Sequence, residues 1–288
     1  MRWRGLRRSQ NVDDQRGQGG FRGSGMPLRL GGGGGIGVVL LLVVLYFVAG
    51  PDALMQLLGG TNVSSVDRPV GAPSQPLPND EAGEFIAAVL GSTEDVWGQI
   101  FTQGGGRYEA PLLTRFDQAV QSACGFNTAA TGPFYCPPDR RVYLDTSFFQ
   151  DLARMGGPGD FAQAYVIGHE VGHHVQNLLG IADEVRSQQS QVSRSDANLM
   201  QVRMELQADC YAGVWAHHAN RTHQVLEPGD VQEGLAAAAA IGDDRLQRSA
   251  GRSVHPESFT HGTSQQRQQW LEEGLRTGDP AACNTFGS

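Results

Sequence analysis

The stretch AYVIGHEVGHHVQ, residues 164–176, holds the pattern that decides how this chain folds and what it binds. Its apolar residues recur at helical spacing, so the stretch predicts an amphipathic helix. His169 and His173 are four residues apart and therefore project from one face of that helix. Two imidazoles so placed can each meet one Zn²⁺ at about 2.0–2.1 Å, and Glu170 then points toward the metal-bound water. The pattern predicts a zinc site with Glu170 as its catalytic base.

A helix with a few polar residues near its surface is the competing interpretation. It is the weaker one here, because burying two imidazoles and a carboxylate without a metal costs on the order of several kcal/mol. The residues that follow His173 read HVQNLLG. They lack the last histidine of the HExxHxxGxxH pattern, which argues against a metzincin arrangement. The third protein ligand must come from farther along the chain.

A second predicted helix, with the segment RMELQADCYAG at residues 203–213, offers that ligand. Glu205 and Asp209 are again four residues apart on one face, so Glu205 can complete a His₂Glu site. Asp209 can accept the other ring N–H of His169 and fix its tautomer. A solvated acidic face is the alternative, but the alanines and the glycine beside these acids indicate close helix packing instead.

Four cysteines, Cys124, Cys136, Cys210 and Cys283, all follow residue 50, and such a set allows three disulfide pairings. Disulfides suit an oxidising compartment. The residues around Cys124 and Cys136 look like two arms of a short loop, so we expect that pair and, with it, Cys210–Cys283. A metal site built from cysteines is the alternative, and the lack of any CxxC spacing disfavours it.

The first eighty residues differ in composition from the rest of the chain. Residues 1–30 are rich in Gly, Arg, Gln and Ser and predict a disordered tail. Residues 31–50 carry no charge, are long enough to cross a hydrocarbon core about 30 Å thick, and predict a transmembrane anchor. A signal peptide is the alternative for the strongly apolar part, residues 36–49, but the long preceding tail and a poor cleavage site favour an uncleaved anchor. Residues 51–79 predict a Pro/Gly/Ser linker to a folded domain at residues 80–288.

The charges predict the orientation of this anchor. An excess of arginine before it places the N-terminus in the cytoplasm by the positive-inside rule, so we expect a single-pass membrane protein with its C-terminal domain outside the cytoplasm. Beyond residue 50, 15 basic residues stand against 28 acidic ones. Such an acidic domain is a poor candidate for binding nucleic acid.

The rest of the chain is mainly helical by its periodicity, with extended segments near the beginning of the domain. Helices are predicted within residues 85–90, 94–101, 160–179, 196–219, 230–241 and 263–275, and strands at residues 111–116 and 141–145. The predicted fold class is α+β, mainly helical: a zincin-like metallopeptidase domain with a small N-terminal sheet, preceded by a single transmembrane helix.

Several separate segments of the domain resemble, in order, the neutral zinc metallopeptidases of the bacterial YpfJ type, which are related in helix plan to the gluzincins. The segments are GPFYCPPDRRVYLD at 132–145, the AYVIGHEVGHHVQ helix, RMELQADCYAGVWA at 203–216, IGDD at 241–244 and HGTSQQRQQW at 261–270. The resemblance covers roughly residues 80–285. It implies an anchored, exported metallopeptidase domain at a bacterial cell membrane.

Carried over position by position, the resemblance implies a role for each residue of the motifs. His169 and His173 match the ligand histidines, Glu170 matches the catalytic glutamate, and Glu205 matches the third ligand. Asp209 matches the acid of the ExxxD motif that supports a ligand histidine.

The implied reaction is hydrolysis of a peptide bond in a peptide or protein substrate by a zinc-bound water, with Glu170 as general base. His261 is our candidate for a hydrogen-bond donor to the developing oxyanion, because a loop just before a helix can bring it over the metal. Tyr211 is the fallback for that role. Residues 141–145 are expected to form an edge strand that pairs with the extended substrate, as the gluzincin plan implies.

Two other functions stay open at this point. One is a catalytically latent, zinc-containing binding or scaffold protein at the cell envelope, and the other is a zinc amidase acting on cell-wall peptides. Glu170 argues against the scaffold, because a structural zinc site closes its fourth position with a protein ligand and needs no general base. Protease and amidase differ in pocket shape, on which the sequence is silent.

Overall fold

The computed structural model describes residues 1–17 and 80–287, and helices predominate there over two small sheets. The strands are β1 (Val12–Asp14), β2 (Leu112–Phe116), β3 (Ala119–Ser122), β4 (Gly125–Thr128), β5 (Phe134–Cys136) and β6 (Arg141–Asp145). The helices are α2 (Glu81–Gln103), α3 (Phe148–Arg154), α4 (Asp160–Leu178), α5 (Ile181–Gln189), α6 (Arg194–His223), α7 (Asp230–Ala240), α8 (Asp243–Ser249) and α9 (Ser264–Thr277). The prediction of a mainly helical α+β domain with a small sheet is confirmed.

The larger sheet has the strand order β1-β2-β6-β5. Strands β1 and β6 both run parallel to β2, whereas β5 is antiparallel to β6. The prediction that residues 141–145 form an edge strand is therefore wrong, since β6 lies between β2 and β5. Its residues Val142 to Asp145 are all buried, as expected of a strand that is covered on both faces.

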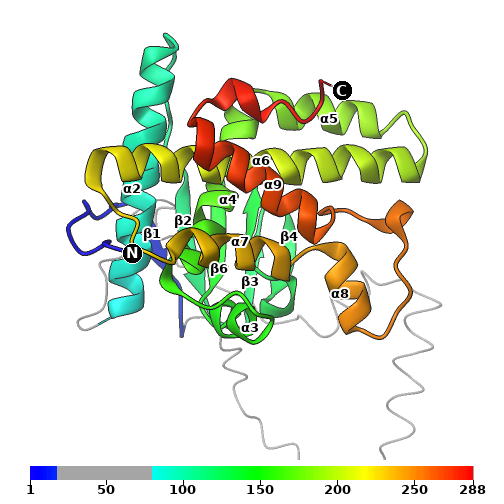
Figure 1. Cartoon of the computed structure of the whole chain (residues 1–288), viewed down its shortest axis with the longest axis horizontal. Coiled ribbons are helices and arrows are strands. Elements are labelled where there is room, and N and C mark those ends of the chain that lie inside the picture. Colours follow the sequence, from blue (N-terminus) through cyan, green and yellow to red (C-terminus); the bar gives the residue numbers. More distant parts are fainter. Residues whose placement is uncertain (18–79, 288) are drawn as a thin grey trace, which may run out of the picture. The chain divides into compact units, whose positions relative to one another are not determined.

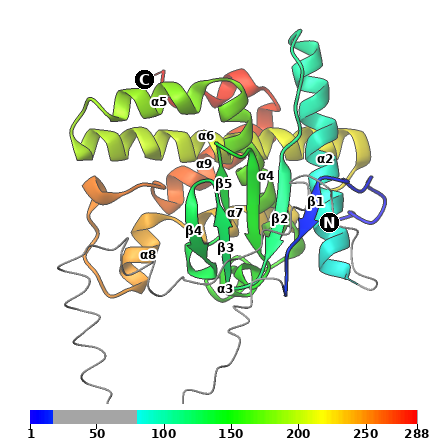
Figure 2. The same ribbon diagram turned by 180° about the vertical axis from the view of Figure 1, so that it is seen from behind.

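The helices gather on one side of this sheet. In Figure 2 the strands stand in front of α4 and α6, and in Figure 1, from the opposite side, α7 and α9 come to the front. Both views have α5 folded back along the long helix α6. The turn between α4 and α5 is made by Gly180 at φ 77°, directly after the predicted helix at residues 160–179.

Helices α4, α6 and α9 approach one another closely because glycines face backbone at their crossings. A Cβ atom on Gly172 of α4 would lie 2.9 Å from the carbonyl oxygen of Ala208 on α6. A Cβ atom on Gly274 of α9 would lie 2.0 Å from the carbonyl oxygen of Cys210 on α6. Neither distance is tolerable, so only glycine permits these crossings. The metal-site motifs on the three helices are thereby brought together.

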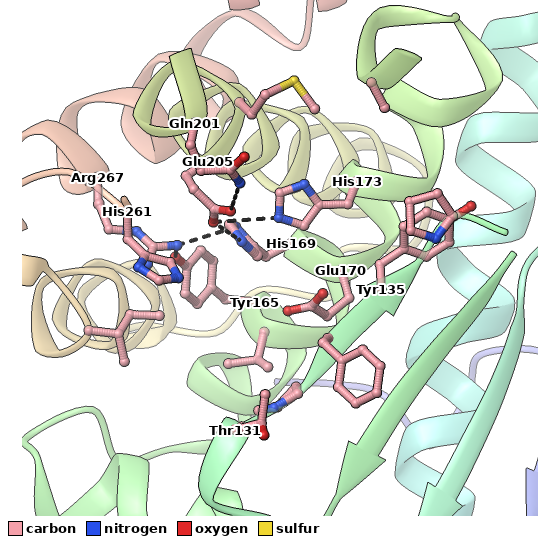
Figure 3. A pocket seen from close by; sticks show the side chains of 18 of the residues that line it. Thr131, Tyr135, Tyr165, His169, Glu170, His173, Gln201, Glu205, His261 and Arg267 are labelled. Carbon is pink, nitrogen blue, oxygen red and sulfur yellow. Dashed lines mark hydrogen bonds and ion pairs between the residues drawn. The ribbon is translucent and has the colours of Figure 1, made fainter. Parts of the chain in front are cut away.

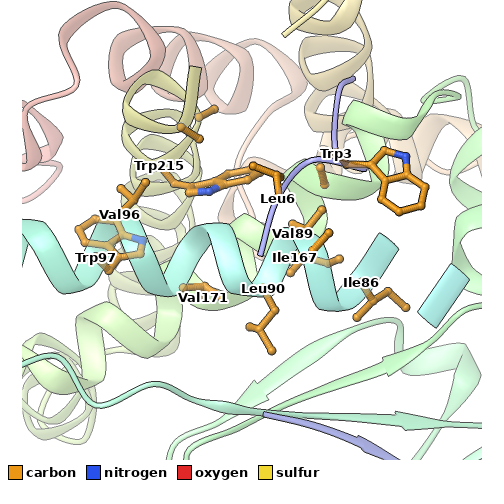
Figure 4. Close-up of a cluster of buried hydrophobic side chains, with 14 of the residues drawn as sticks. Trp3, Leu6, Ile86, Val89, Leu90, Val96, Trp97, Ile167, Val171 and Trp215 are labelled. Atoms are coloured by element: carbon orange, nitrogen blue, oxygen red, sulfur yellow. The ribbon is translucent and has the colours of Figure 1, made fainter. Parts of the chain in front are cut away.

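The first seventeen residues belong to this fold, and the prediction of a disordered tail is wrong for them. Trp3, Leu6 and Val12 are each at least 92% buried, and β1 pairs with β2. Figure 4 shows Trp3 and Leu6 among the apolar side chains of α2 and α4. The burial of this segment could not be predicted from the sequence, because three apolar residues without helical or strand periodicity give no local signal. Their burial depends on partners more than seventy residues away.

The predicted anchor at residues 31–50 and the linker at residues 51–79 lie outside the described residues. Within residues 1–17 and 80–287, none of the helices combines the length and the apolar character needed to cross a bilayer.

Both expected disulfides are present. Cys124–Cys136 closes the β-hairpin region onto β5, and Cys210–Cys283 ties the C-terminal end of the chain to α6. The cysteine metal site considered as the alternative is excluded, because all four thiols are consumed.

Candidate active site

Three predicted ligands meet at the crossing of α4 and α6. The Oε2 atom of Glu205 lies 3.1 Å from Nε2 of His169 and 3.5 Å from Nε2 of His173. Ligands that are each about 2.0–2.1 Å from a tetrahedral zinc ion stand about 3.3–3.4 Å apart, which the two distances bracket. Figure 3 shows the three side chains converging from two helices. The donor set and its spacing therefore fit Zn²⁺.

A buried polar network holds the ring of His169. Its Nδ1 lies 2.8 Å from Oδ1 of Asp209, as the sequence predicted, so the Nε2 lone pair is left for a metal. Asp209 is fully buried and also accepts hydrogen bonds from the Tyr165 hydroxyl at 2.6 Å and from Nε of Arg267 at 2.8 Å. A second bond from Nη2 of Arg267 makes the pair bidentate. The carboxylate thus stays ionised without contact to water.

His173 is oriented by an amide instead of an acid. Nε2 of Gln176 donates to the backbone oxygen of Met204 at 2.8 Å, which fixes which way the amide points. Its Oε1 then faces Nδ1 of His173 at 2.8 Å and accepts the proton of that nitrogen. The Nε2 atom of His173 is left free toward Glu205.

The ionisation of these groups follows from burial opposed by their neighbours. Burial alone would lower the pKa of His169, but the charge and hydrogen bond of Asp209 outweigh it and raise that pKa to about 10, so a metal that binds at Nε2 displaces a proton there. Burial also acts to raise the pKa of Asp209. The charges of Arg267 and His169 overcome this effect and hold the pKa of Asp209 at about 2. Burial raises the pKa of Glu170, and the charges of His169 and His173 do not cancel this effect. Of Glu170, Asp209 and Glu205, Glu170 is therefore the carboxylate that takes up a proton most readily.

The three candidate ligands and Glu170 line one cavity of about 590 Å³. Strand β5 and helices α3, α4, α5, α6, α8 and α9 contribute to its walls. Much of the wall is apolar, from Phe134, Phe148, Met155, Val166, Ile241 and Leu246. The cavity can hold several residues of a peptide next to the candidate metal position.

His261 lies on the same cavity, in the loop before α9 (Figure 3). Its Nδ1 is 3.3 Å from Oδ1 of Asp243, and its backbone N–H donates to Oδ2 of the same acid at 2.6 Å. The hydrogen bond with Asp243 raises the pKa of the His261 ring. Tyr211, the fallback for the same role, is misplaced, since it packs edge to face on Trp97 in the core and does not line the cavity.

Three further histidines take structural positions. His174 is fully buried and bonded to the Tyr135 hydroxyl and the Glu109 carbonyl, and burial lowers its pKa to about 4. His217 and His218 bond to backbone oxygens at the end of α9. None of these three lies on the cavity.

Sequence reasoning missed three polar residues of the site: Arg267, Gln176 and Asp243. Arg267 and Asp243 lie in the segments HGTSQQRQQW and IGDD, in which the sequence pointed to a role for His261 alone. An arginine flanked by glutamines in a helix is a weak signal, because its partner Asp209 is 58 residues away. The pairing of Arg267 with Asp209 can be recognised only in the folded structure, where α6 packs against α9.

Comparison with known proteins agrees with this geometry. A family model described as "Putative neutral zinc metallopeptidase" matches residues 1–286. The chain is 48% identical over 290 residues to "Uncharacterized protein YpfJ" of Escherichia coli (strain K12), across 100% of this chain and 99% of that protein. It is 44% identical over 214 residues to "Uncharacterized protein Rv2575" of Mycobacterium tuberculosis (strain ATCC 25618 / H37Rv), across 70% of each chain. No solved structure matches the chain. The family match starts at residue 1 and so includes the N-terminal segment that packs on α2.

Proposed function

This chain belongs to the neutral zinc metallopeptidase family, and from that premise we propose that it hydrolyses peptide bonds with Zn²⁺ held by His169, His173 and Glu205. The family implies Zn²⁺ as the cofactor and a peptide or protein as the substrate. The observation that carries the proposal is the arrangement of the three donor atoms. Both Nδ1 atoms are engaged by Asp209 and Gln176, so both Nε2 lone pairs point at one position next to Glu205.

Zn²⁺ held by these three residues would supply Lewis acidity to activate a water molecule and polarise the scissile carbonyl. Glu170 lies on the same cavity wall and takes the proton of that water. Its raised pKa, caused by burial, suits a group that must hold a proton and then give it to the leaving amine.

His261 is proposed as the hydrogen-bond donor to the oxyanion. Because Asp243 holds Nδ1, the Nε2 atom is the ring donor left for substrate. The raised pKa of the ring favours the protonated form, in which Nε2 carries a hydrogen.

The substrate is proposed to lie along β5 in extended form. This strand is paired with β6 on one side only and forms the edge of the larger sheet. Its residues Phe134 and Tyr135 line the cavity together with Glu170. A free strand edge binds an extended peptide through backbone hydrogen bonds, so β5 takes the place that the sequence had given to residues 141–145.

The test compares zinc content and cleavage of an unfolded protein in the full chain and two variants. Glu170→Gln should keep one zinc and lose roughly 10²–10⁴-fold in kcat, because only the proton acceptor is removed. Glu205→Ala should lose zinc as well as activity. Glu272→Gln, an exposed glutamate on α9, is the matched control and should behave as wild type.

Two results would overturn the proposal. One is undiminished cleavage by zinc-loaded Glu170→Gln. The other is a zinc-loaded wild type that cleaves neither unfolded proteins nor cell-wall peptides, which would indicate a zinc-containing binding protein. Cleavage of cell-wall peptides alone would instead identify an amidase at the same site.

A further inference from the structure

The segment at residues 1–17 contributes buried side chains to the main hydrophobic core of the domain. The Trp3 ring stands edge to face on Phe85 of α2, with centroids 5.5 Å apart. Leu6 and Val12 join the same buried cluster as Leu90 of α2. Figure 4 shows this part of the core.

Backbone contacts make this docking specific. The Ser9 N–H donates to the Ala87 oxygen of α2 at 2.8 Å, and the Leu113 N–H donates to the Asn11 oxygen at 2.8 Å. A Cβ atom on Gly91 of α2 would lie 2.4 Å from the Arg7 carbonyl oxygen. Helix α2 therefore carries a glycine at the point where the segment crosses it.

The two ends of residues 18–79 are held together by one cluster of ion pairs. Nη2 of Arg16 lies 2.5 Å from Oδ2 of Asp80, the N-cap residue of α2. Arg115 of β2, only 1% exposed, bridges Asp80 at 2.5 Å and Asp14 at 3.3 Å. The chain therefore leaves the domain and returns to it at the same place.

The contacts between residues 1–17 and the rest of the domain constrain the membrane topology. A single crossing within residues 18–79 would put residues 1–17 and 80–287 on opposite faces of a bilayer, which their contacts forbid. Two crossings need about 40 apolar residues, since one helical span takes about 20. Residues 18–79 contain one uncharged stretch of about 20 residues, residues 31–50, which is enough for one span and not for two.

We propose that residues 1–17 and 80–287 occupy the same compartment, with no membrane between them. Any contact of residues 36–49 with a bilayer is then made from the face on which the catalytic domain lies. This replaces the single-pass anchor with a cytoplasmic N-terminus that the arginine excess suggested. It does not depend on the proposed peptidase activity.

Single cysteines test this in spheroplasts that express the full chain, with the unsubstituted chain as the control for labelling of the four native cysteines, which lie in two disulfides in the structure. Arg4→Cys and Arg276→Cys place thiols at side chains that are 75% and 67% exposed, on the N-terminal segment and on α9. A membrane-impermeant maleimide should label both sites, or neither until lysis. Labelling of one site alone in intact spheroplasts would overturn the proposal.

A second measurement keeps the test valid if a cysteine variant misfolds. Trp3→Ala in the full chain should lower the Tm by roughly 6–20 °C, as expected for a large aromatic removed from a core. Arg276→Gln, which loses an exposed ion pair with Glu273 on α9, should shift it by no more than about 4 °C. An unchanged Tm in Trp3→Ala would show that the segment is not docked, and the proposal would fail.

Discussion

At the scale of single residues, the site depends on charges that are buried in pairs. Asp209 is fully buried, and Arg267 is the cation that allows it to remain a carboxylate behind His169. Removing one partner of such a pair costs far more than the pair itself contributes, because the remaining charge is left without water or counter-ion. Arg267 is therefore a positioning residue for a metal ligand, at a distance from the metal.

Arg267→Met should lower the free energy of unfolding by about 3–5 kcal/mol and zinc affinity by roughly 10–100-fold. Arg267→Lys should fall between this variant and wild type, since lysine keeps the charge and loses the bidentate fork. Chemical denaturation and competition with a chromophoric chelator measure the two effects. Arg276→Met, on the exposed face of the same helix, is the control. Wild-type zinc affinity in a folded Arg267→Met protein would contradict this role.

At the scale of elements, the two disulfides differ in the length of chain that they close. Cys210–Cys283 spans 73 residues and Cys124–Cys136 spans 12. Cys210 follows Asp209 on α6, and the Cys283 carbonyl accepts a hydrogen bond from Gln207 at 2.9 Å. The longer loop thus ends beside the metal site.

Replacing Cys210 and Cys283 by alanine should cost about 4 kcal/mol of stability, against about 3 kcal/mol for the Cys124 and Cys136 pair, from loop entropy alone. Denaturant titration of the two double variants gives this comparison. Zinc affinity should fall in the first variant and not in the second, because only the first loosens α6. The reverse order in either measurement would count against this interpretation.

The ion pairs at the start of α2 make stability depend on pH. Burial acts to raise the pKa of Asp80, but the hydrogen bond and charge of Arg115 and the Gly83 N–H overcome it and lower the pKa to about 2. A depressed folded-state pKa stabilises the protein above the unfolded pKa near 4, and this contribution is lost as the pH falls from about 4 to about 2.

Asp80→Asn should reduce stability at pH 6 by about 1–2 kcal/mol, a figure reduced for solvent screening, and should flatten the fall of stability between pH 4 and pH 2. Asparagine still caps a helix, so the loss reflects the ion pairs. Urea unfolding at a series of pH values measures it, with the exposed Asp183→Asn as control. If the free energy of unfolding of Asp80→Asn falls as steeply between pH 4 and pH 2 as that of wild type, Asp80 is excluded as a source of acid sensitivity.

At the scale of the whole molecule, the domain is assembled from two separate parts of the chain. Without residues 1–17, β2 loses one of its two parallel partners and Phe85 loses the Trp3 ring. The domain boundary at residue 80 that composition suggested therefore cuts through a core.

A fragment of residues 80–288 should unfold at a lower temperature than the full chain and bind a hydrophobic dye. A synthetic peptide of residues 1–17 should restore its Tm in a concentration-dependent way, because a ligand that binds only the folded state stabilises it. The same peptide with Trp3→Ala should not. Equal Tm values for the fragment and the full chain would show that the segment contributes nothing to the fold.

The sequence by itself determined the parts of this protein that rest on local periodicity. The spacing of His169 and His173 on α4, and of Glu205 and Asp209 on α6, follows from 3.6 residues per turn, so the residue pattern alone identifies the candidate ligands. The helix stop at Gly180 and the short disulfide loop are local in the same sense.

Only the tertiary structure decided the features that join distant residues. Arg267 meets Asp209 because glycines let α9 approach α6, and β5 replaces β6 at the sheet edge because strand order is set by pairing. Residues 1–17 fold only against α2 and β2, since they bury too little apolar surface to hold a structure alone. The local sequence pattern cannot predict such contacts. Each residue of the pair gives no signal by itself, and its partner is known only once the chain has packed.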